Sequence, residues 1–181
     1  MKSLFLSAAA LALSAGFALA DNPMVGGAAM YDTKNIVENA MNSADHTTLV
    51  AAVVAAGLAE TLSGPGPFTV LAPTNEAFAK LPAGTVETLL KPENKDMLVK
   101  ILTCHVIAGN AMAADIMGMV EGDGGKHVVT TVGGCDFTLS TVDGKVMIED
   151  GQGNMATVTI ADVKQSNGVI HVIDTVLLPK M

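Results

Sequence analysis

The period of the hydrophobic pattern changes partway along the chain, and this change limits the fold more than any other feature of the sequence. From Asn35, apolar residues recur at helical spacing, as in Ile36, Val37, Ala40 and Met41. Past Cys104 the sequence consists of short runs that favour strands, at 127–132, 135–141, 145–149, 156–160 and 169–178. Helices first and strands later predict an α+β fold, in which helices cover a mostly antiparallel sheet.

Between these two regions the sequence predicts a strand, a tight corner and a short helix. The β-favouring run 68–71 stops at Pro73, and Thr74 or Asn75 can cap a helix over 76–79. Further helical spacing is found at 49–54, 58–62, 86–90 and 97–102. Asp143-Gly144, between two alternating runs, is a strong signal for a two-residue hairpin.

The first 20 residues are typical of a cleavable signal peptide. Lys2 precedes an apolar stretch that ends in Ala18-Leu19-Ala20, the small-x-small pattern before a cleavage site. An uncleaved anchor is the alternative, but serines and a glycine interrupt a run that is shorter than the roughly 20 residues of a membrane span. We therefore predict cleavage near Ala20-Asp21 and a secreted, periplasmic or surface location. Residues 21–32 are Gly- and Ala-rich, which predicts a flexible leader before one domain at 33–181.

The charge of the chain excludes some classes of partner. Ten lysines, no arginine and 18 acidic residues give a net charge of −8, and loss of Lys2 with the signal peptide makes it −9. Nucleic acid requires a clustered basic surface, so it is not an expected partner. We expect no insertion into a membrane, because no later segment is long and apolar enough.

Cys104 and Cys135 are the only cysteines, and both lie in apolar segments with the pattern of strands. Export to an oxidising compartment favours a disulfide between them. The bond would close a loop of about 31 residues and stabilise the fold by roughly 3.5–4 kcal/mol. Two buried free thiols are the alternative.

Three stretches, taken with their spacing, resemble the fasciclin domain family. The segment 68–78, Phe-Thr-Val-Leu-Ala-Pro-Thr-Asn-Glu-Ala-Phe, resembles the first signature of the family, and the segment 166–179 resembles the second. Between them, Cys104-His105 stands in place of a central Tyr-His motif, with cysteine where tyrosine is usual. The resemblance covers about residues 33–180. It implies helices packed on a wedge-shaped, mostly antiparallel β-sandwich.

The resemblance also implies a function, because fasciclin domains are mostly secreted or surface-displayed modules for adhesion or matrix contact, without known catalysis. In animal members, an Asp-Ile pair before the second signature binds integrin. Asp162-Val163 holds that place in this chain, with Val for Ile, so it is a candidate interaction site. The remaining motif residues are expected to maintain the fold; they are Thr74, Asn75, His105, Asn167, Gly168, His171 and Asp174.

His105 and His171 each stand between apolar neighbours, so two interpretations apply to them. Histidine is a common metal ligand and titrates near neutral pH, which would make either one a ligand or a pH switch. The alternative is a buried, hydrogen-bonded structural histidine. A zinc site of both histidines with Cys104 and Cys135 does not match the spacing of known ligand sets. Neither a metal nor a cofactor is expected.

The sequence contains no catalytic motif of the kinds G-x-S-x-G, H-E-x-x-H, C-x-x-C or P-loop, so we do not expect an enzyme. Residues 151–156 match G-x-G-x-x-A by letters, but a strand-like run follows where a dinucleotide site needs a helix. Asp150, Gln152 and Asn154 resemble part of a calcium loop that lacks its glycine, so a hairpin loop is the simpler interpretation.

Two functions remain. The first is a non-enzymatic adhesion or interaction module whose partner is a cell-surface or matrix protein or a polysaccharide, with oligomerisation providing avidity. The second is a carrier that holds a small apolar ligand between helices and sheet, where methionines give an adaptable lining.

Overall fold

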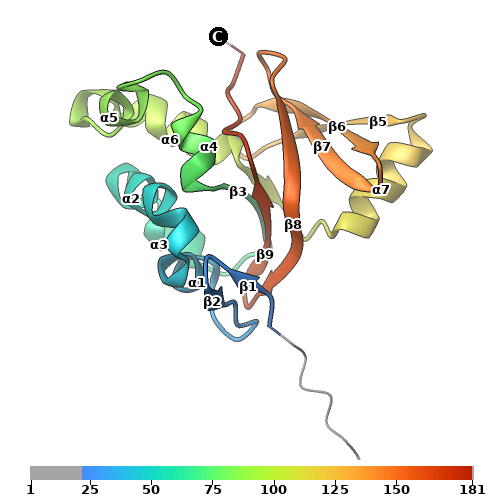
Figure 1. Ribbon diagram of the computed structural model, residues 1–181, viewed down its shortest axis with the longest axis horizontal. Helices are drawn as coiled ribbons and strands as arrows, with labels where there is room; N and C mark the ends of the chain where they lie inside the picture. Colours follow the sequence, from blue (N-terminus) through green and yellow to red (C-terminus); the bar gives the residue numbers. More distant parts are fainter. Residues whose placement is uncertain (1–21, 181) are drawn as a thin grey trace, which may run out of the picture.

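A seven-stranded sheet with the order β4-β3-β9-β8-β7-β6-β5 organises the chain (Figure 1). This is a computed structural model, and it describes residues 22–180. The expected signal peptide lies outside these residues. The strands of the large sheet are β3 Phe68–Pro73, β4 Val106–Ala108, β5 Lys126–Thr130, β6 Asp136–Val142, β7 Lys145–Glu149, β8 Met155–Gln165 and β9 Gly168–Ile173.

Seven α-helices and two 3-10 turns accompany the strands in the described part of the chain. They are α1 Ile36–Asn42, η1 Ala44–His46, α2 Thr47–Ala56, α3 Ala59–Ser63, α4 Asn75–Ala79, α5 Thr85–Leu89, η2 Pro92–Asn94, α6 Lys95–Cys104 and α7 Ala113–Gly122. In Figure 1 helices α1 to α6 gather on one side of β3 and β9, whereas α7 lies with β5–β7 on the other. None of the helices between residues 22 and 180 is long and apolar enough to cross a membrane.

The two fasciclin-like signatures become neighbouring strands at the centre of the sheet. β3 pairs with β9 in parallel, from Phe68 opposite Gly168 to Pro73 opposite Ile173, and the other strand pairs are antiparallel. β8 is interrupted by two register shifts, between Val158 and Val163. Bulges of this kind bend a strand, so β8 belongs to both halves of the sheet. The expectation of an α+β fold with a mostly antiparallel, wedge-shaped sheet is confirmed.

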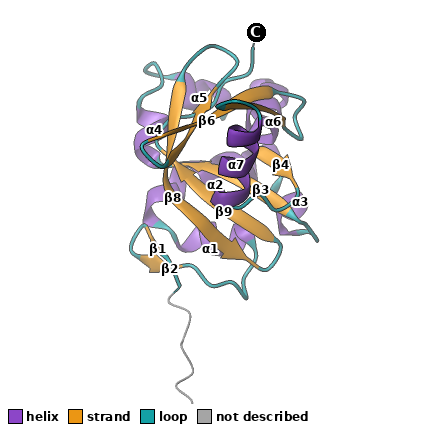
Figure 2. Cartoon of the chain, turned by 90° about the vertical axis from the view of Figure 1, so that its right-hand side faces the viewer, coloured by secondary structure: helices purple, strands orange, loops and turns teal. Residues whose placement is uncertain are grey.

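Two hydrophobic clusters fill the two sides of the sheet. The larger cluster joins α1–α6 to β3 and β9, through buried residues such as Leu49, Leu102 and Ile170. The smaller joins α7 to β5–β8, where Ile116 and Val120 pack against Phe137. Figure 2 shows α7 in front of the strands that it covers. The alternation of apolar and polar residues along β6 and β7 therefore directs every second side chain towards α7.

The flexible leader expected at residues 21–32 is wrong over its described part. Residues 24–29 form a hairpin, β1 Met24–Val25 and β2 Ala28–Ala29, whose turn contains Gly26 and Gly27 at positive φ. Val25 is 3% exposed and Met30 is 2% exposed, because both pack into the larger cluster. Two apolar side chains are enough to attach this segment, and the Gly-rich composition serves the turn.

Three local expectations also differ from the structure. Helix α7 was not expected in the strand-rich half, although Ile116 and Val120 lie one turn apart on it. Cys104 is the last residue of α6 and does not lie in a strand. The run 169–178 is strand only as far as Ile173, because the chain then leaves the sheet. In contrast, the strand at 145–149 and the Asp143-Gly144 hairpin are confirmed.

Candidate functional site

The corner after β3 is held by the polar residues of the first signature. Thr74 caps α4, because its hydroxyl accepts a hydrogen bond from the Ala77 N–H at 3.2 Å. The Asn75 side chain accepts from the Thr48 N–H at 3.0 Å and donates to the Ala44 carbonyl at 2.9 Å. Asn75 therefore ties α4 to the start of α2, and it has an internal structural task.

The second signature contains an equally constrained turn before β9. The Asn167 amide donates to the carbonyls of Leu62 and Gly64 and accepts from the Ile36 N–H at 3.0 Å. A Cβ atom at Gly168 would lie 2.0 Å from the Phe68 carbonyl oxygen, so only glycine fits. These contacts join the turn at Asn167 to two segments that lie more than 100 residues earlier in the sequence.

Asp174 continues this network where the chain leaves β9. Its Oδ1 atom accepts from the Thr157 N–H at 2.8 Å and from the Thr175 hydroxyl at 3.1 Å. Lys80 of the α4 C-terminus donates to the Asp174 carbonyl at 2.6 Å. Asp174 thus links β8 to α4, in agreement with the expectation that it maintains the fold.

His105 lies between α6 and β4 and uses both of its ring nitrogens inside the protein. The Leu177 N–H can only donate, so Nε2 accepts it at 2.9 Å, and Nδ1–H donates to the Ile101 carbonyl at 2.8 Å. Burial lowers the pKa of His105 from 6.5 to about 4, while the bond to Ile101 and the charge of Asp150 oppose this shift. A neutral imidazole with both nitrogens occupied fits the structural interpretation and leaves no lone pair for a metal.

His171, in the centre of β9, has the opposite tautomer. Its Nδ1 accepts from the Asp162 N–H at 3.2 Å, and its Nε2–H donates to the Ala111 carbonyl at 2.7 Å. The ring is 0% exposed, and this burial lowers its pKa, against the opposing effects of the Ala111 bond and the Asp162 charge. His171 therefore connects β9 to the segment that leads into α7.

The candidate interaction pair is divided by the fold. Asp162 lies in the bulged part of β8 at a φ of 60°, and its carboxylate accepts from the Ala113 N–H at 2.7 Å, at the start of α7. Val163 is 0% exposed and packs in the larger cluster. A buried Val163 is not available to a partner, so this arrangement favours a structural role for the pair.

Sequence reasoning missed three buried polar groups that stabilise the fold. His46 donates from Nε2 to the Ala72 carbonyl at 3.4 Å and accepts from the Ser43 hydroxyl at 2.8 Å, and burial lowers its pKa. Asn39 and Gln165 bond to each other inside the larger cluster. None of these three residues belongs to a signature. In the sequence, each is marked only as a polar residue on an otherwise apolar face.

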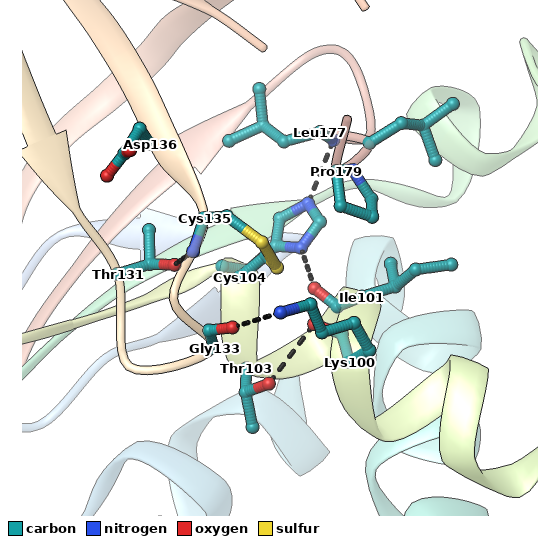
Figure 3. Close-up of a disulfide and its surroundings, with 12 residues drawn as sticks. Lys100, Ile101, Thr103, Cys104, Thr131, Gly133, Cys135, Asp136, Leu177 and Pro179 are labelled. Atoms are coloured by element: carbon teal, nitrogen blue, oxygen red, sulfur yellow. Dashed lines mark hydrogen bonds between the residues drawn. A yellow bond between two sulfur atoms is a disulfide. The ribbon is translucent and has the colours of Figure 1, made fainter. Parts of the chain in front are cut away.

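The disulfide connects the two ends of the sheet. Cys104 is bonded to Cys135, and their Cα atoms are 5.4 Å apart. Cys104 precedes β4, the strand at one end, and Cys135 follows β5, the strand at the other. Next to it, the Val132 N–H donates to the Val106 carbonyl at 2.8 Å and the Gly133 N–H donates to the Thr103 carbonyl at 3.0 Å. The expected pairing is therefore present, and it ties the end of α6 to the turn between β5 and β6 (Figure 3).

The motif residues make hydrogen bonds inside the protein, whereas the outer face of β5–β8 is accessible from outside. We use the name outer face for two cross-strand rows whose side chains point away from α7. They are Val128, Thr138, Glu149 and Met155, and Lys126, Ser140, Met147 and Thr157. Val128 is 60% exposed and Met155 is 43% exposed at the two ends of the first row. The Lys126 ammonium lies 3.7 Å from the Glu149 carboxylate between the rows.

The chemistry of the outer face suits contact with another molecule better than catalysis. Hydroxyl groups, exposed apolar side chains and one exposed ion pair are the mixture found in interfaces between separately folded proteins. Residues 22–180 contain no group of three or more His, Cys, Asp or Glu side chains arranged for a metal. A space of about 40 Å³ that reaches His105 lies between helices and sheet, and its lining is apolar.

Asp150 shows why its loop does not have the chemistry of a calcium site. Its carboxylate accepts from the N–H groups of Gln152, Asn154 and Leu178, at 2.8–2.9 Å. Backbone donors point at the oxygens that a cation would need. The interpretation of 150–154 as a hairpin loop fits this geometry.

Comparisons with known proteins agree with the signatures. The model of the fasciclin domain matches residues 44–179. Protein sll1483 of Synechocystis sp. is 53% identical over 158 residues, which cover 87% of this chain and 81% of that protein. The immunogenic protein MPB70 of Mycobacterium bovis is 35% identical, over 77% of this chain and 66% of that protein.

More distant relatives carry the domain within longer chains. The transforming growth factor-beta-induced protein ig-h3 of Sus scrofa is 36% identical over 73% of this chain, which corresponds to 17% of that protein. A FAS1 domain pair from the insect cell adhesion molecule fasciclin I superposes with a TM-score of 0.71 at 17% identity, over 81% of this chain and 51% of that one. That likeness concerns the fold alone. With its signatures paired at the centre of the sheet and its family model matched over residues 44–179, this chain belongs to the fasciclin domain family.

Proposed function

We propose that this chain is an exported interaction module that contributes to adhesion through the outer face of β5–β8, without catalysis. The observation that carries the proposal is the contrast between the two sets of residues. The polar motif residues are engaged in internal hydrogen bonds, whereas the outer face presents the exposed apolar side chains of Val128 and Met155 beside an exposed ion pair. Fasciclin I, described as an insect cell adhesion molecule, supports a contact function by its fold.

The outer face has the composition expected of a transient interface. Val128 and Met155 supply exposed apolar area, while Thr138 and Glu149 between them keep the surface soluble. Lys126 lies on the edge strand β5, and an edge lysine opposes uncontrolled pairing of strands. The face is therefore suited to a specific partner, for which we propose a cell-surface or matrix protein, with a polysaccharide as the other outcome.

Export is the second part of the proposal. A buried disulfide between the two ends of the sheet is stable in an oxidising compartment and is rare in the cytosol. A relative from Mycobacterium bovis, MPB83, is described as a cell surface glycolipoprotein. N-terminal sequencing of the protein recovered outside the cytoplasm should begin near Asp21, and a sequence that begins at Met1 would contradict cleavage.

Attachment of protein-coated beads tests the adhesive function. Beads that carry the exported chain are expected to attach to cells of the strain that encodes it, or to each other, at levels well above beads coated with an unrelated acidic protein. A single domain binds through one face, so avidity on the bead should exceed the binding of free monomer by a factor of about 100 or more. Pretreatment of the cells with protease or with glycosidases distinguishes a protein partner from a polysaccharide.

Charge substitutions locate the binding surface. Replacing the two exposed apolar side chains of the outer face, Val128→Lys with Met155→Lys, should reduce attachment at least tenfold, because interface energy concentrates in few residues. The matched control is Val54→Lys with Met41→Lys, since these residues are 61% and 65% exposed on helices away from the sheet. Equal attachment by both double variants would refute the outer face as the binding surface.

A further inference from the structure

A groove of about 550 Å³ lies on the side of the molecule away from the outer face, between α5–α6 and the segment that follows β9. Its lining is largely apolar, with Leu81, Leu89, Ile101 and Leu178 at the base. Met97 lies in the same groove and is 54% exposed, so it adds accessible apolar surface to the lining. The volume is within the range of about 300–1,000 Å³ that small-molecule sites occupy.

One wall of the groove is fixed in place by hydrogen bonds. The Leu178 N–H donates to the Asp150 carboxylate at 2.9 Å, and the Leu178 carbonyl accepts from the Gly151 N–H at 3.1 Å. The Gln152 side chain donates to the Pro179 carbonyl at 3.3 Å. The C-terminal segment is thus tied to the loop before β8, as Figure 1 shows by their proximity, and the groove exists without a ligand.

The charges of the groove differ from those of the chain as a whole. Among residues 22–180, Lys100 and Lys180 are the two charged residues that line it, and no acidic side chain of these residues does, although the chain has 18 acidic residues and ten lysines. The Lys100 ammonium donates to the Gly133 carbonyl, which holds its position beside the groove while its other N–H groups remain available (Figure 3). An apolar groove with two ammonium groups matches a ligand with an apolar tail and an anionic head.

We propose that this groove binds a single-chain amphiphile with a carboxylate head, of the class of medium- and long-chain fatty acids. The tail lies against Leu89, Met97 and Ile101, and the carboxylate meets Lys100 and Lys180. The site is separate from the outer face, so either proposal can fail alone. Unlike a carrier site between helices and sheet, it lies between helices and the C-terminal segment.

Titration calorimetry with sodium octanoate, decanoate and dodecanoate, each below its micelle concentration, tests the site on the delipidated full chain. Each added methylene should tighten binding about fourfold, because it buries further apolar surface. Dodecyltrimethylammonium has the same tail as dodecanoate but a cationic head, and it should bind at least tenfold more weakly. Equal affinity for the two dodecyl compounds, or no saturable binding of dodecanoate, would overturn the proposal.

Paired variants assign the binding to the groove. Met97→Glu and Lys180→Glu should each weaken dodecanoate at least tenfold. Met41→Glu and Lys164→Glu make the same changes at exposed positions outside the groove, and they should stay within twofold of the parent. Indistinguishable affinities across the four variants would exclude the groove. The chain could also bind vesicles that contain anionic phospholipid while it fails to bind monomeric dodecanoate. This result would identify a membrane surface as the ligand and would refute the proposal.

Discussion

Reduction of the Cys104–Cys135 disulfide should destabilise the fold by an amount that can be calculated from its place in the chain. The two residues are 31 positions apart, and the chain-entropy model assigns about 3.7 kcal/mol at 25 °C to a loop of that length. The loss arises mainly in the unfolded state, which gains freedom once the loop opens. The native state keeps the two neighbouring hydrogen bonds that the turn after β5 donates to Val106 of β4 and to Thr103 of α6.

Reduction of the parent protein is a better perturbation than substitution. Cys104 is 0% exposed and Cys135 is 6% exposed, so alanine at both positions would also remove two buried sulfur atoms and leave a cavity. Reduction keeps every atom and breaks one bond. The double alanine variant should therefore be less stable than the reduced parent, and the difference measures the packing of the sulfurs.

Urea unfolding of the oxidised and reduced parent provides the measurement. We expect the free energy of unfolding to fall by about 3.7 kcal/mol on reduction, with a decrease in Tm of about 7–15 °C. The m-value should rise, because the unfolded chain without its loop exposes more surface. A difference below about 1 kcal/mol would refute the entropic reasoning, and two free thiols in the unfolded, unreduced protein would refute the bond.

Three further predictions concern single residues. The pKa of His105 is about 4 in the folded state and 6.5 in the unfolded state, so unfolding takes up a proton between these two pH values. The contribution of His105 to the free energy of unfolding should therefore be constant above about pH 6.5 and fall by about 3 kcal/mol towards pH 4. Urea titrations at pH 7 and pH 5 should show a smaller pH dependence in His105→Asn, and an unchanged slope would contradict this assignment. Gly168→Ala should lower the free energy of unfolding by about 3 kcal/mol, because the added Cβ would meet the Phe68 carbonyl. Gly118→Ala in α7, where a Cβ would meet nothing within 4 Å, should raise it by about 1 kcal/mol. Similar melting temperatures for the two variants would count against the close contact at Gly168. Asp162→Ala should lower the free energy of unfolding by about 2 kcal/mol, because it removes the acceptor at the start of α7 and places alanine at a positive φ. Asp162→Asn should lower it by less than about 1 kcal/mol and keep bead attachment. Loss of attachment in a stable Asn variant would show that Asp162 is a binding residue.

The sequence predicts those parts of the fold that depend on local pattern. The strand at 145–149 is a short β-favouring run with Val146 and Ile148 on one face, and Asp143-Gly144 has the chemistry of its turn, so both are found where expected. Helix α7 was missed because Gly118 and Gly122 weaken its helical pattern, and its stability comes from packing on β5–β7. The hairpin at 24–29 was missed for a related reason, since its buried contacts are supplied by distant helices.

The candidate site is predictable only in part, because its residues act through long-range contacts. The signatures identify Asn75, Asn167 and Asp174 as residues with a special role, but not which N–H or carbonyl each would meet. The burial of Val163 depends on two register shifts in β8 that no local pattern reveals. The outer face becomes visible only when the strand register places residues of four strands in common rows.

The parallel pairing of β3 with β9 has a consequence for the order in which this protein is made and folds. β9 is the last strand of the chain, yet it lies between β3 and β8 in the sheet, with Ile173 eight residues from the end of the sequence. A nascent chain that lacks β9 has no central strand on which the two halves of the sheet can assemble, so stable structure must await the synthesis of β9. Under the proposed export, late formation of the sheet would keep the polypeptide unfolded during its passage across a membrane, and the fold would then form in the compartment where its cysteines can be oxidised.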